Sequence, residues 1–170
     1  MEIQLAEALK RIGESFPLAG SIIVGEETYL GRTLVFREPI LVEGTFSFDG
    51  EAVQVEGSAK TVLLSNCARC NEPFNEALSF RFSERFEKAS RWAEEHETYP
   101  FEGESILADQ MVMDNLFLNL PLVSVCSKDC KGLCPVCGAN RNRIDCGCEQ
   151  KGKESPFAVL EKMTNKHKEV

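Results

Sequence analysis

The chain has 170 residues, of which 43% are hydrophobic and 27% are charged, and its net charge at pH 7 is −8. This length and composition suit one globular domain, or one domain with a small appendage, and no apolar run approaches the ~20 residues of a membrane helix. The N-terminus lacks the basic start and apolar run of a signal peptide, so we expect a soluble intracellular protein.

The charge is unevenly distributed. Residues 1–125 hold 10 Lys/Arg and 21 Asp/Glu, a net −11, whereas residues 126–170 hold 9 and 6, a net +3. An acidic body suits a basic protein partner better than a phosphate backbone, because non-specific nucleic-acid binding depends on Lys and Arg. Nucleic-acid contact would need the local basic set near the C-terminus, for which a solvated loop surface is the alternative: Lys128, Lys131, Arg141, Arg143, Lys151 and Lys153.

The N-terminal third gives weak signals. Residues 1–12 place Leu5, Leu9 and Ile12 at helical spacing, which predicts a short helix, with a short strand as the alternative for the first residues. Residues 13–32 are punctuated by glycine and predict one strand near Ser21–Val24, otherwise loop.

Two hairpins are predicted next. Residues 40–48 and 51–64 flank Asp49-Gly50, a dipeptide typical of tight hairpin turns because both residues accept positive φ. Gly57 suggests a bulge or bend in the second run. Residues 60–66 and 76–87 then form a second hairpin, with Cys67 and Cys70 at its tip.

Residues 87–104 are acidic and lack periodicity, so we expect an exposed loop. His96 in this loop and His167 near the C-terminus have no partner spacing and are interpreted as surface residues rather than ligands. Trp92 is interpreted as a packing residue.

Residues 105–120 predict a helix, with Ser105 as N-cap and Pro121 ending it. Apolar residues cover most of its circumference, which indicates a helix buried against the sheet. After a polar linker, Ser155–Met163 predict a short helix that either docks on the domain or recognises a partner.

These elements predict an α+β fold: an antiparallel β-rich meander or partly open barrel with a buried helix and a C-terminal zinc loop. The expected organisation is a β-rich domain over residues 1–125 that includes the helix at 105–120, a cysteine-rich zinc-binding loop over 126–150, and a linker with a short helix over 151–170.

The eight cysteines form four close pairs: Cys67/Cys70, Cys126/Cys130, Cys134/Cys137 and Cys146/Cys148. Eight thiols in four chelating pairs are the number needed for two tetrahedral four-cysteine zinc sites. Disulfides are the main alternative, but thiols stay reduced in the expected compartment. A thioredoxin-like use of Cys67 and Cys70 would need a βαβ setting, whereas the residues after Cys70 predict a turn.

Three arrangements of four pairs on two metals are possible. We favour Cys67/Cys70 with Cys126/Cys130, and Cys134/Cys137 with Cys146/Cys148, because the latter set closes a short loop at little entropic cost. The first site would then join the hairpin tip to the segment after the helix. The main alternative combines Cys67/Cys70 with Cys134/Cys137. A four-thiolate site has no open position for water, so a structural role and no enzymatic activity are expected.

The motifs Cys67-Ala-Arg-Cys70, Leu118-Asn-Leu-Pro121, the run from Cys126 to Asn140, and Cys146-Gly-Cys148 resemble the YceD family of large ribosomal RNA subunit accumulation proteins. Pro156-Phe-Ala-Val-Leu160 also resembles the family's ending. The resemblance implies a cytoplasmic bacterial, or an organellar, ribosome-assembly factor without established catalytic activity. Its implied partner is the ribosomal precursor particle, which it would contact through a basic ribosomal protein, 23S rRNA or both. Neither a membrane nor a small-molecule substrate is expected.

Two other functions remain open at this point. One is a zinc-ribbon regulator that binds nucleic acid alone. The residues predicted to contact RNA, in the assembly factor as well, are Lys128, Lys131, Arg141 and Arg143. The other is a thiol redox protein that uses Cys67 and Cys70.

Overall fold

The computed structural model describes residues 1–92 and 97–149. It divides the chain into two compact units. The first unit comprises Met1–Ala68 and Glu72–Lys128, and the second comprises Arg69–Asn71 and Asp129–Val170.

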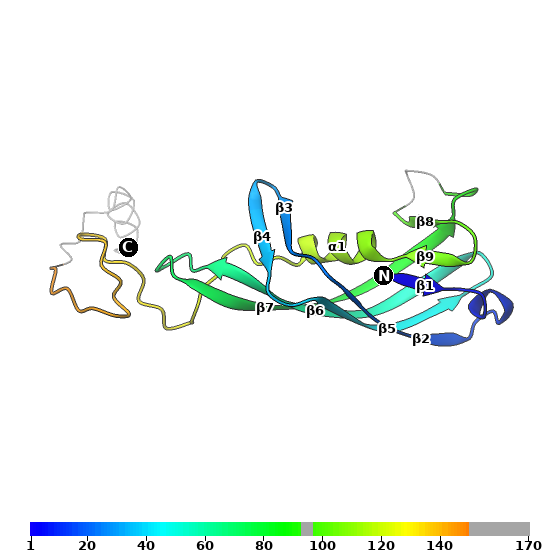
Figure 1. Cartoon of the computed structure of the whole chain (residues 1–170), viewed down its shortest axis with the longest axis horizontal. Coiled ribbons are helices and arrows are strands. Elements are labelled where there is room, and N and C mark those ends of the chain that lie inside the picture. The colour runs from blue at the N-terminus through cyan, green and yellow to red at the C-terminus, as the bar shows by residue number, and fades with distance from the viewer. Residues whose placement is uncertain (93–96, 150–170) are drawn as a thin grey trace, which may run out of the picture. The chain divides into compact units, whose positions relative to one another are not determined.

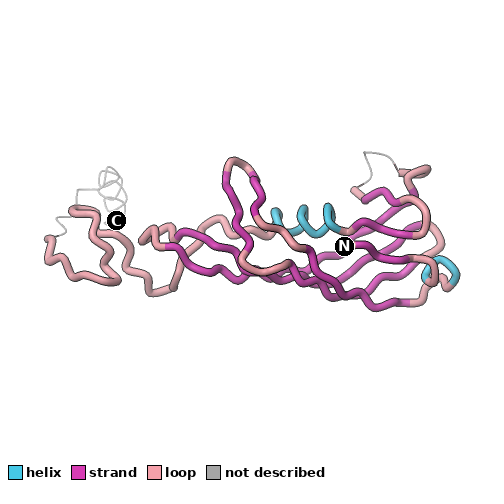
Figure 2. Tube along the Cα trace, viewed as in Figure 1, coloured by secondary structure: helices cyan, strands magenta, loops and turns pink. Residues whose placement is uncertain are grey.

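The first unit contains all the named strands and helices (Figures 1 and 2). The strands are β1 (Glu2–Gln4), β2 (Ser15–Ile22), β3 (Glu26–Tyr29), β4 (Arg32–Phe36), β5 (Ile40–Phe48), β6 (Ala52–Asn66), β7 (Pro73–Lys88), β8 (Tyr99–Phe101) and β9 (Ser105–Leu107). A 3-10 helix spans Ala8–Lys10, and α1 spans Asp109–Leu118. No helix among the described residues has the length and apolar character needed to cross a membrane.

Strand β6 is the centre of a seven-stranded sheet. It pairs along its whole length with β7, and its other edge pairs first with β5 and then with β4. Strand β2 adds to β5, β3 to β4 and β8 to β7, while β1 and β9 form a separate two-stranded sheet. All pairs are antiparallel except β7–β8. The predicted antiparallel, strand-rich architecture is confirmed, but the sheet is not closed into a barrel.

Both predicted hairpins are present. Asp49 organises the β5–β6 turn, since its Oδ1 accepts hydrogen bonds from the backbone N–H groups of Glu51 and Ala52, each 2.8 Å long. Its other oxygen lies 2.9 Å from a guanidinium nitrogen of Arg85 on β7. Gly50 has a φ of 102°, whereas Asp49 does not have a positive φ, so only the glycine of the dipeptide takes that conformation.

Gly57 does not mark a bulge, because the β5–β6 and β6–β7 ladders run through it without interruption. It lies opposite Gly44, and a Cβ at Gly57 would meet the carbonyl oxygen of Glu43 at 2.4 Å and Cζ of Phe82 at 2.9 Å. Glycine is therefore needed here for the close approach of two backbones.

Helix α1 covers one face of the sheet (Figure 1). Its Met111, Val112 and Leu116 are fully buried with the sheet residues of the core. Strand β7 supplies Leu78, Phe80, Phe82 and Phe86 to this core at the predicted period of two. Asn115 of the helix also donates a 2.8 Å hydrogen bond to Glu84 of β7. One apolar face of α1 therefore fixes it on the sheet.

The helix is shorter than predicted. Residues 105–107 form β9 instead, because Ser105 pairs with Gln4 of β1, and the N-cap is Ala108 rather than Ser105. The prediction of burial around most of the helix is also wrong: the side chain of Leu118 is 80% exposed.

The N-terminal predictions need correction as well. Residues 1–12 form β1 and the 3-10 helix rather than one helix, so the alternative of a short strand for the first residues is the one found. Strand β2 begins six residues before the predicted Ser21, and β3 lies within the segment expected to be loop, whose last residue, Arg32, begins β4. Residues 87–104 include the end of β7 and β8, and Trp92 donates a hydrogen bond to the Thr98 carbonyl. His96, His167 and the predicted helix at Ser155–Met163 lie outside the described residues.

Candidate metal centres

The structure gathers the eight cysteines into two groups of four, each with its sulfur atoms within 4.8 Å of one another. The first cysteine group is Cys67, Cys70, Cys126 and Cys130; the second is Cys134, Cys137, Cys146 and Cys148. This is the favoured grouping from the sequence, and all eight cysteines are free of disulfides. Their role as metal ligands stays a prediction.

The β6–β7 turn presents Cys67 and Cys70, both of which are buried. The Cys67 N–H donates to the Glu72 carbonyl, and the Ala68 N–H donates to the Ser124 carbonyl at 2.8 Å. Asn71 closes the turn with a φ of 57°, in the left-handed region that asparagine tolerates better than most residues. The backbone of the turn thus fixes where the two sulfurs lie.

Ser124, two residues before Cys126, is held by a side chain of β7. Its hydroxyl donates a 2.8 Å hydrogen bond to Oε2 of Glu76, which also accepts one from Ser65 of β6 at 2.7 Å. Ser124 is buried, and this network anchors the segment that leads to Cys126.

Within the second unit, Arg69 and Cys130 are directly bonded, since the Arg69 guanidinium donates to the Cys130 carbonyl at 3.1 Å. The Arg69 carbonyl in turn accepts from the Leu133 N–H at 2.9 Å. Gly132 has a φ of 70°, and a Cβ there would lie 3.0 Å from the Arg69 carbonyl oxygen. Close backbone packing thus places Arg69, the residue before Cys70, against the chain around Cys130.

Two asparagines that sequence reasoning did not single out organise the surroundings of Cys130. The Asn142 amide donates to the Cys130 sulfur at 3.3 Å and to Oδ1 of Asn140 at 2.9 Å. Its Oδ1 accepts from the Lys131 N–H at 2.8 Å. Their position between Cys137 and Cys146 was the available signal, but asparagine has too many uses in loops for that signal to be decisive.

The second cysteine group is built on two tight turns. The Gly138 N–H donates to the Cys134 carbonyl, and the Cys134 N–H donates to the Ala139 carbonyl, both at 2.8 Å. Gly138 directly follows the Cys134/Cys137 pair, and Gly147 lies inside the Cys146/Cys148 pair. Their φ values of 75° and 59° are in the left-handed region that glycine accepts. These turns point both pairs of thiols at one place.

Two thiols of this group, Cys134 and Cys148, have pKa values shifted in opposite directions. Backbone hydrogen bonds from Cys137 and Val136 lower the pKa of Cys134 from 9.0 to about 6. Hydrogen bonds with Cys137 and Cys146 raise the pKa of Cys148 from 9.0 to about 12. A metal ion that bound these sulfurs as thiolates would displace protons from the thiols.

The donor set fits zinc. Zn–S bonds of about 2.3 Å in a tetrahedron place the sulfurs about 3.8 Å apart, so the sulfurs of each group need only small shifts. Four thiolates select soft or borderline metals such as Zn²⁺, whereas Mg²⁺ and Ca²⁺ prefer oxygen. Each group would hold one ion in a closed site with no position for a substrate.

The four basic residues predicted to contact RNA are all exposed: Lys128, Lys131, Arg141 and Arg143. In the second unit, the Arg141 N–H donates to the Gly132 carbonyl at 2.9 Å, so the backbones that carry Lys131 and Arg141 lie side by side. Lys151 and Lys153 lie outside the described residues.

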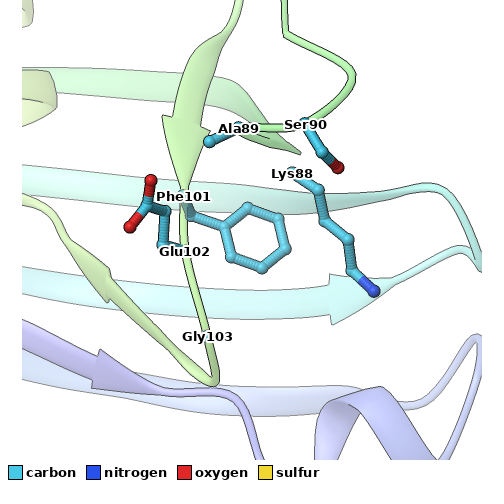
Figure 3. Close-up of a pocket in the computed structure, with 6 residues that line it drawn as sticks. All are labelled: Lys88, Ala89, Ser90, Phe101, Glu102 and Gly103. Atoms are coloured by element: carbon cyan, nitrogen blue, oxygen red, sulfur yellow. The ribbon is translucent and has the colours of Figure 1, made fainter.

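A separate hollow of about 370 Å³ in the first unit is lined by Lys88, Ala89, Ser90, Phe101, Glu102 and Gly103. The ring of Phe101 lies between the Lys88 ammonium and the Glu102 carboxylate, which point apart (Figure 3). The two groups do not form an acid–base pair, and the hollow contains no cysteine.

Residues 55–164, which include both cysteine groups, match the family described as large ribosomal RNA subunit accumulation protein YceD. The chain belongs to the YceD family. The match also covers most of β6, all of β7 and the helix, so the matched region contains both cysteine groups and the two strands whose turn carries Cys67 and Cys70.

Curated relatives support this assignment. The protein named large ribosomal RNA subunit accumulation protein YCED homolog 1, chloroplastic, of Arabidopsis thaliana is 24% identical over 138 residues, which cover 64% of this chain and 43% of that protein. Its Zea mays counterpart of the same name is 24% identical over 145 residues, 66% of this chain and 50% of that protein.

An uncharacterized protein of Mycobacterium tuberculosis is 34% identical over 92 residues, 52% of this YceD chain and 44% of that protein. The aligned region thus spans about half the length of the curated relatives or less. No solved structure matches the chain.

Proposed function

We propose that this YceD protein is a non-enzymatic ribosome-assembly factor, with two structural zinc ions, that supports the accumulation of 23S rRNA. The observation that carries the proposal is the family match over residues 55–164, which spans both cysteine groups. The family description and the names of the two plant relatives both refer to large-subunit ribosomal RNA.

Zinc would act here through structure. Each cysteine group offers four sulfur ligands, and a closed four-thiolate ion neither activates water nor binds substrate. The metal would instead fix the β6–β7 turn and the loop that carries the basic residues. Neither group thus provides an active site, which supports a role without catalysis.

Two sets of residues are suited to the precursor particle. Lys128, Lys131, Arg141 and Arg143 are exposed and can neutralise rRNA phosphates. The first unit, with its 10 Lys/Arg against 21 Asp/Glu, suits a basic ribosomal protein. The proposal therefore assigns rRNA contact to the basic set and protein contact to the acidic unit.

Sedimentation and depletion test this function together. A tagged wild-type protein is expected to co-migrate with large-subunit precursors in a sucrose gradient, and its depletion is expected to lower 23S rRNA relative to 16S rRNA. A protein that stays at the top of the gradient, in cells whose rRNA ratio does not change on depletion, would contradict the proposal.

An independent nucleic-acid-binding regulator is a second candidate, because the backbones of Lys131 and Arg141 lie side by side in the second unit. Binding of the purified protein to rRNA fragments and duplex DNA over a salt series separates the two. A regulator would bind nucleic acid alone, with an affinity that falls steeply as salt rises. An assembly factor whose rRNA contact depends on a bound protein partner would, by itself, bind rRNA weakly at every salt concentration.

A further inference from the structure

The first unit contains an apolar groove of about 310 Å³ near the tip of the β3–β4 hairpin. Here it is called the leucine groove, and its lining is Tyr29, Leu30, Arg32, Leu34, Phe117, Leu118, Leu120, Pro121 and Leu122. The hairpin rises from the sheet on the face that α1 covers (Figure 1). The rings of Tyr29 and Phe117 stack 4.2 Å apart at an interplanar angle of 2°, so the hairpin and the helix together form a defined wall.

The groove exposes leucines that the core does not use. Leu30 is 84% exposed, Leu118 is 80% exposed and Leu122 is 98% exposed. Single exposed leucines are common, but several around one hollow mark a binding surface. Arg32 is the only charged residue of the lining.

The backbone at Leu30 also points to a role outside folding. Leu30 and Gly31 form the two-residue β3–β4 turn with φ values of 49° and 75°. Asparagine is favoured at the first position of such a turn, whereas a leucine with positive φ is strained. The turn conformation thus keeps the apolar side chain of Leu30 exposed at the edge of the groove, despite the backbone strain.

The net charge of the first unit indicates which kind of segment the leucine groove would bind. The first unit has 10 Lys/Arg against 21 Asp/Glu, a net −11, and Glu26 and Glu27 of β3 are exposed on the same hairpin. The first unit of a second copy of the chain would bring the same excess of negative charge and be repelled. A segment with positive charge and apolar side chains would be attracted to the unit and would also fill the groove.

We propose that the leucine groove binds a positively charged segment of a partner protein through that segment's apolar side chains. The inference deepens the proposed function and rests on it only for the expectation that the partner is ribosomal. Leu30, Leu118 and Leu122 form the contact, and Arg32 at the groove's edge receives a carboxylate or carbonyl group of the segment.

The test begins with a photo-crosslinking amino acid in place of Leu122 in the full chain, expressed in cells. The crosslinked peptide is sequenced, and a synthetic copy of it is titrated against purified protein. We expect a peptide from another protein with net positive charge and at least two large apolar residues.

Leu30→Asn separates binding from folding. Asparagine suits the turn, so the melting temperature is expected to stay the same or rise, while affinity for the synthetic peptide falls about tenfold or more. Leu107→Ser is the matched control, because Leu107 is 71% exposed and lies outside the groove, and this variant is expected to bind like wild type.

Several outcomes would decide against the groove as a partner site. Crosslinks only to a second copy of the chain, to its own residues 150–170, or to nothing would overturn the inference, as would unchanged affinity in Leu30→Asn. A basic non-ribosomal partner would support the groove and contradict the ribosomal assignment. A second variant carries the photo-crosslinking amino acid in place of Lys131. If it crosslinks to ribosomal components while the Leu122 variant does not, the result contradicts only the groove.

Discussion

The amide nitrogen of Asn142 lies 3.3 Å from the sulfur of Cys130 and donates a hydrogen bond to it. An N–H donor stabilises the negative charge of a thiolate and restricts the direction in which the sulfur can point. The Lys131 N–H and Oδ1 of Asn140 hold the same amide in place. Asn142 therefore positions Cys130, a proposed ligand, without being a proposed ligand itself.

Asn142→Ala is expected to weaken zinc binding at the first cysteine group by about 10- to 100-fold, because the supporting hydrogen bond is lost. Competition with a chromogenic chelator measures the change, and the second site is expected to keep its affinity. Asn75→Ala is the matched control, since Asn75 is an exposed residue of β7 outside both groups. Equal zinc affinity in the two variants would show that Asn142 has no such role.

The grouping of the cysteines is tested by paired substitutions. Because each group would hold its own ion, Cys67→Ser with Cys126→Ser is expected to remove one zinc and leave the other. Cys67→Ser with Cys134→Ser is expected to remove both. The alternative arrangement, with Cys67/Cys70 and Cys134/Cys137 on one metal, predicts the opposite pattern, and zinc content per chain distinguishes the two.

Gly57→Ala is expected to lower the free energy of unfolding by about 1–3 kcal/mol, because the added Cβ would meet backbone atoms that the ladder holds in place. Gly25→Ala is the control, as a Cβ there has no neighbour within 4 Å, and its change is expected to stay below about 1 kcal/mol. Urea denaturation measures both. Equal stabilities would mean that the two backbones do not approach as closely as described.

Asp49 gives a prediction with pH dependence. Hydrogen bonds from the Ala52 and Glu51 backbone lower the pKa of Asp49 below its ordinary 3.8, with a further contribution from Arg85. Its contribution to stability is therefore complete above pH 3.8 and is lost as the pH falls through the lowered pKa. Asp49→Ala is expected to cost about 1 kcal/mol at pH 7 and less at pH 3, as measured by urea denaturation. A difference that does not shrink in acid would contradict this.

The sequence predicted the two central hairpins well because their signals are local. Asp49-Gly50 dictates a turn, and the alternation of Leu78, Phe80 and Phe82 dictates which face of β7 is buried. The close pairs of cysteines also follow from local spacing, and the shorter loop between Cys137 and Cys146 favoured the grouping that the structure has.

The remaining features depend on contacts between distant residues. Ser105 pairs with Gln4, which no local pattern reveals, so the predicted helix began too early. Asn142 gains its role only when the chain folds back on Cys130, and the leucine groove exists only because the β3–β4 hairpin stacks Tyr29 on Phe117. The turn residues Leu30-Gly31 were the visible hint of that hairpin.

Metal content is the most direct measurement of the central claim. Protein purified without added zinc, and analysed by inductively coupled plasma mass spectrometry alongside thiol titration, is expected to contain two zinc ions per chain. Its eight thiols are expected to react slowly until a chelator is added. A folded protein that contains no metal, with eight thiols that react at once, would contradict the account.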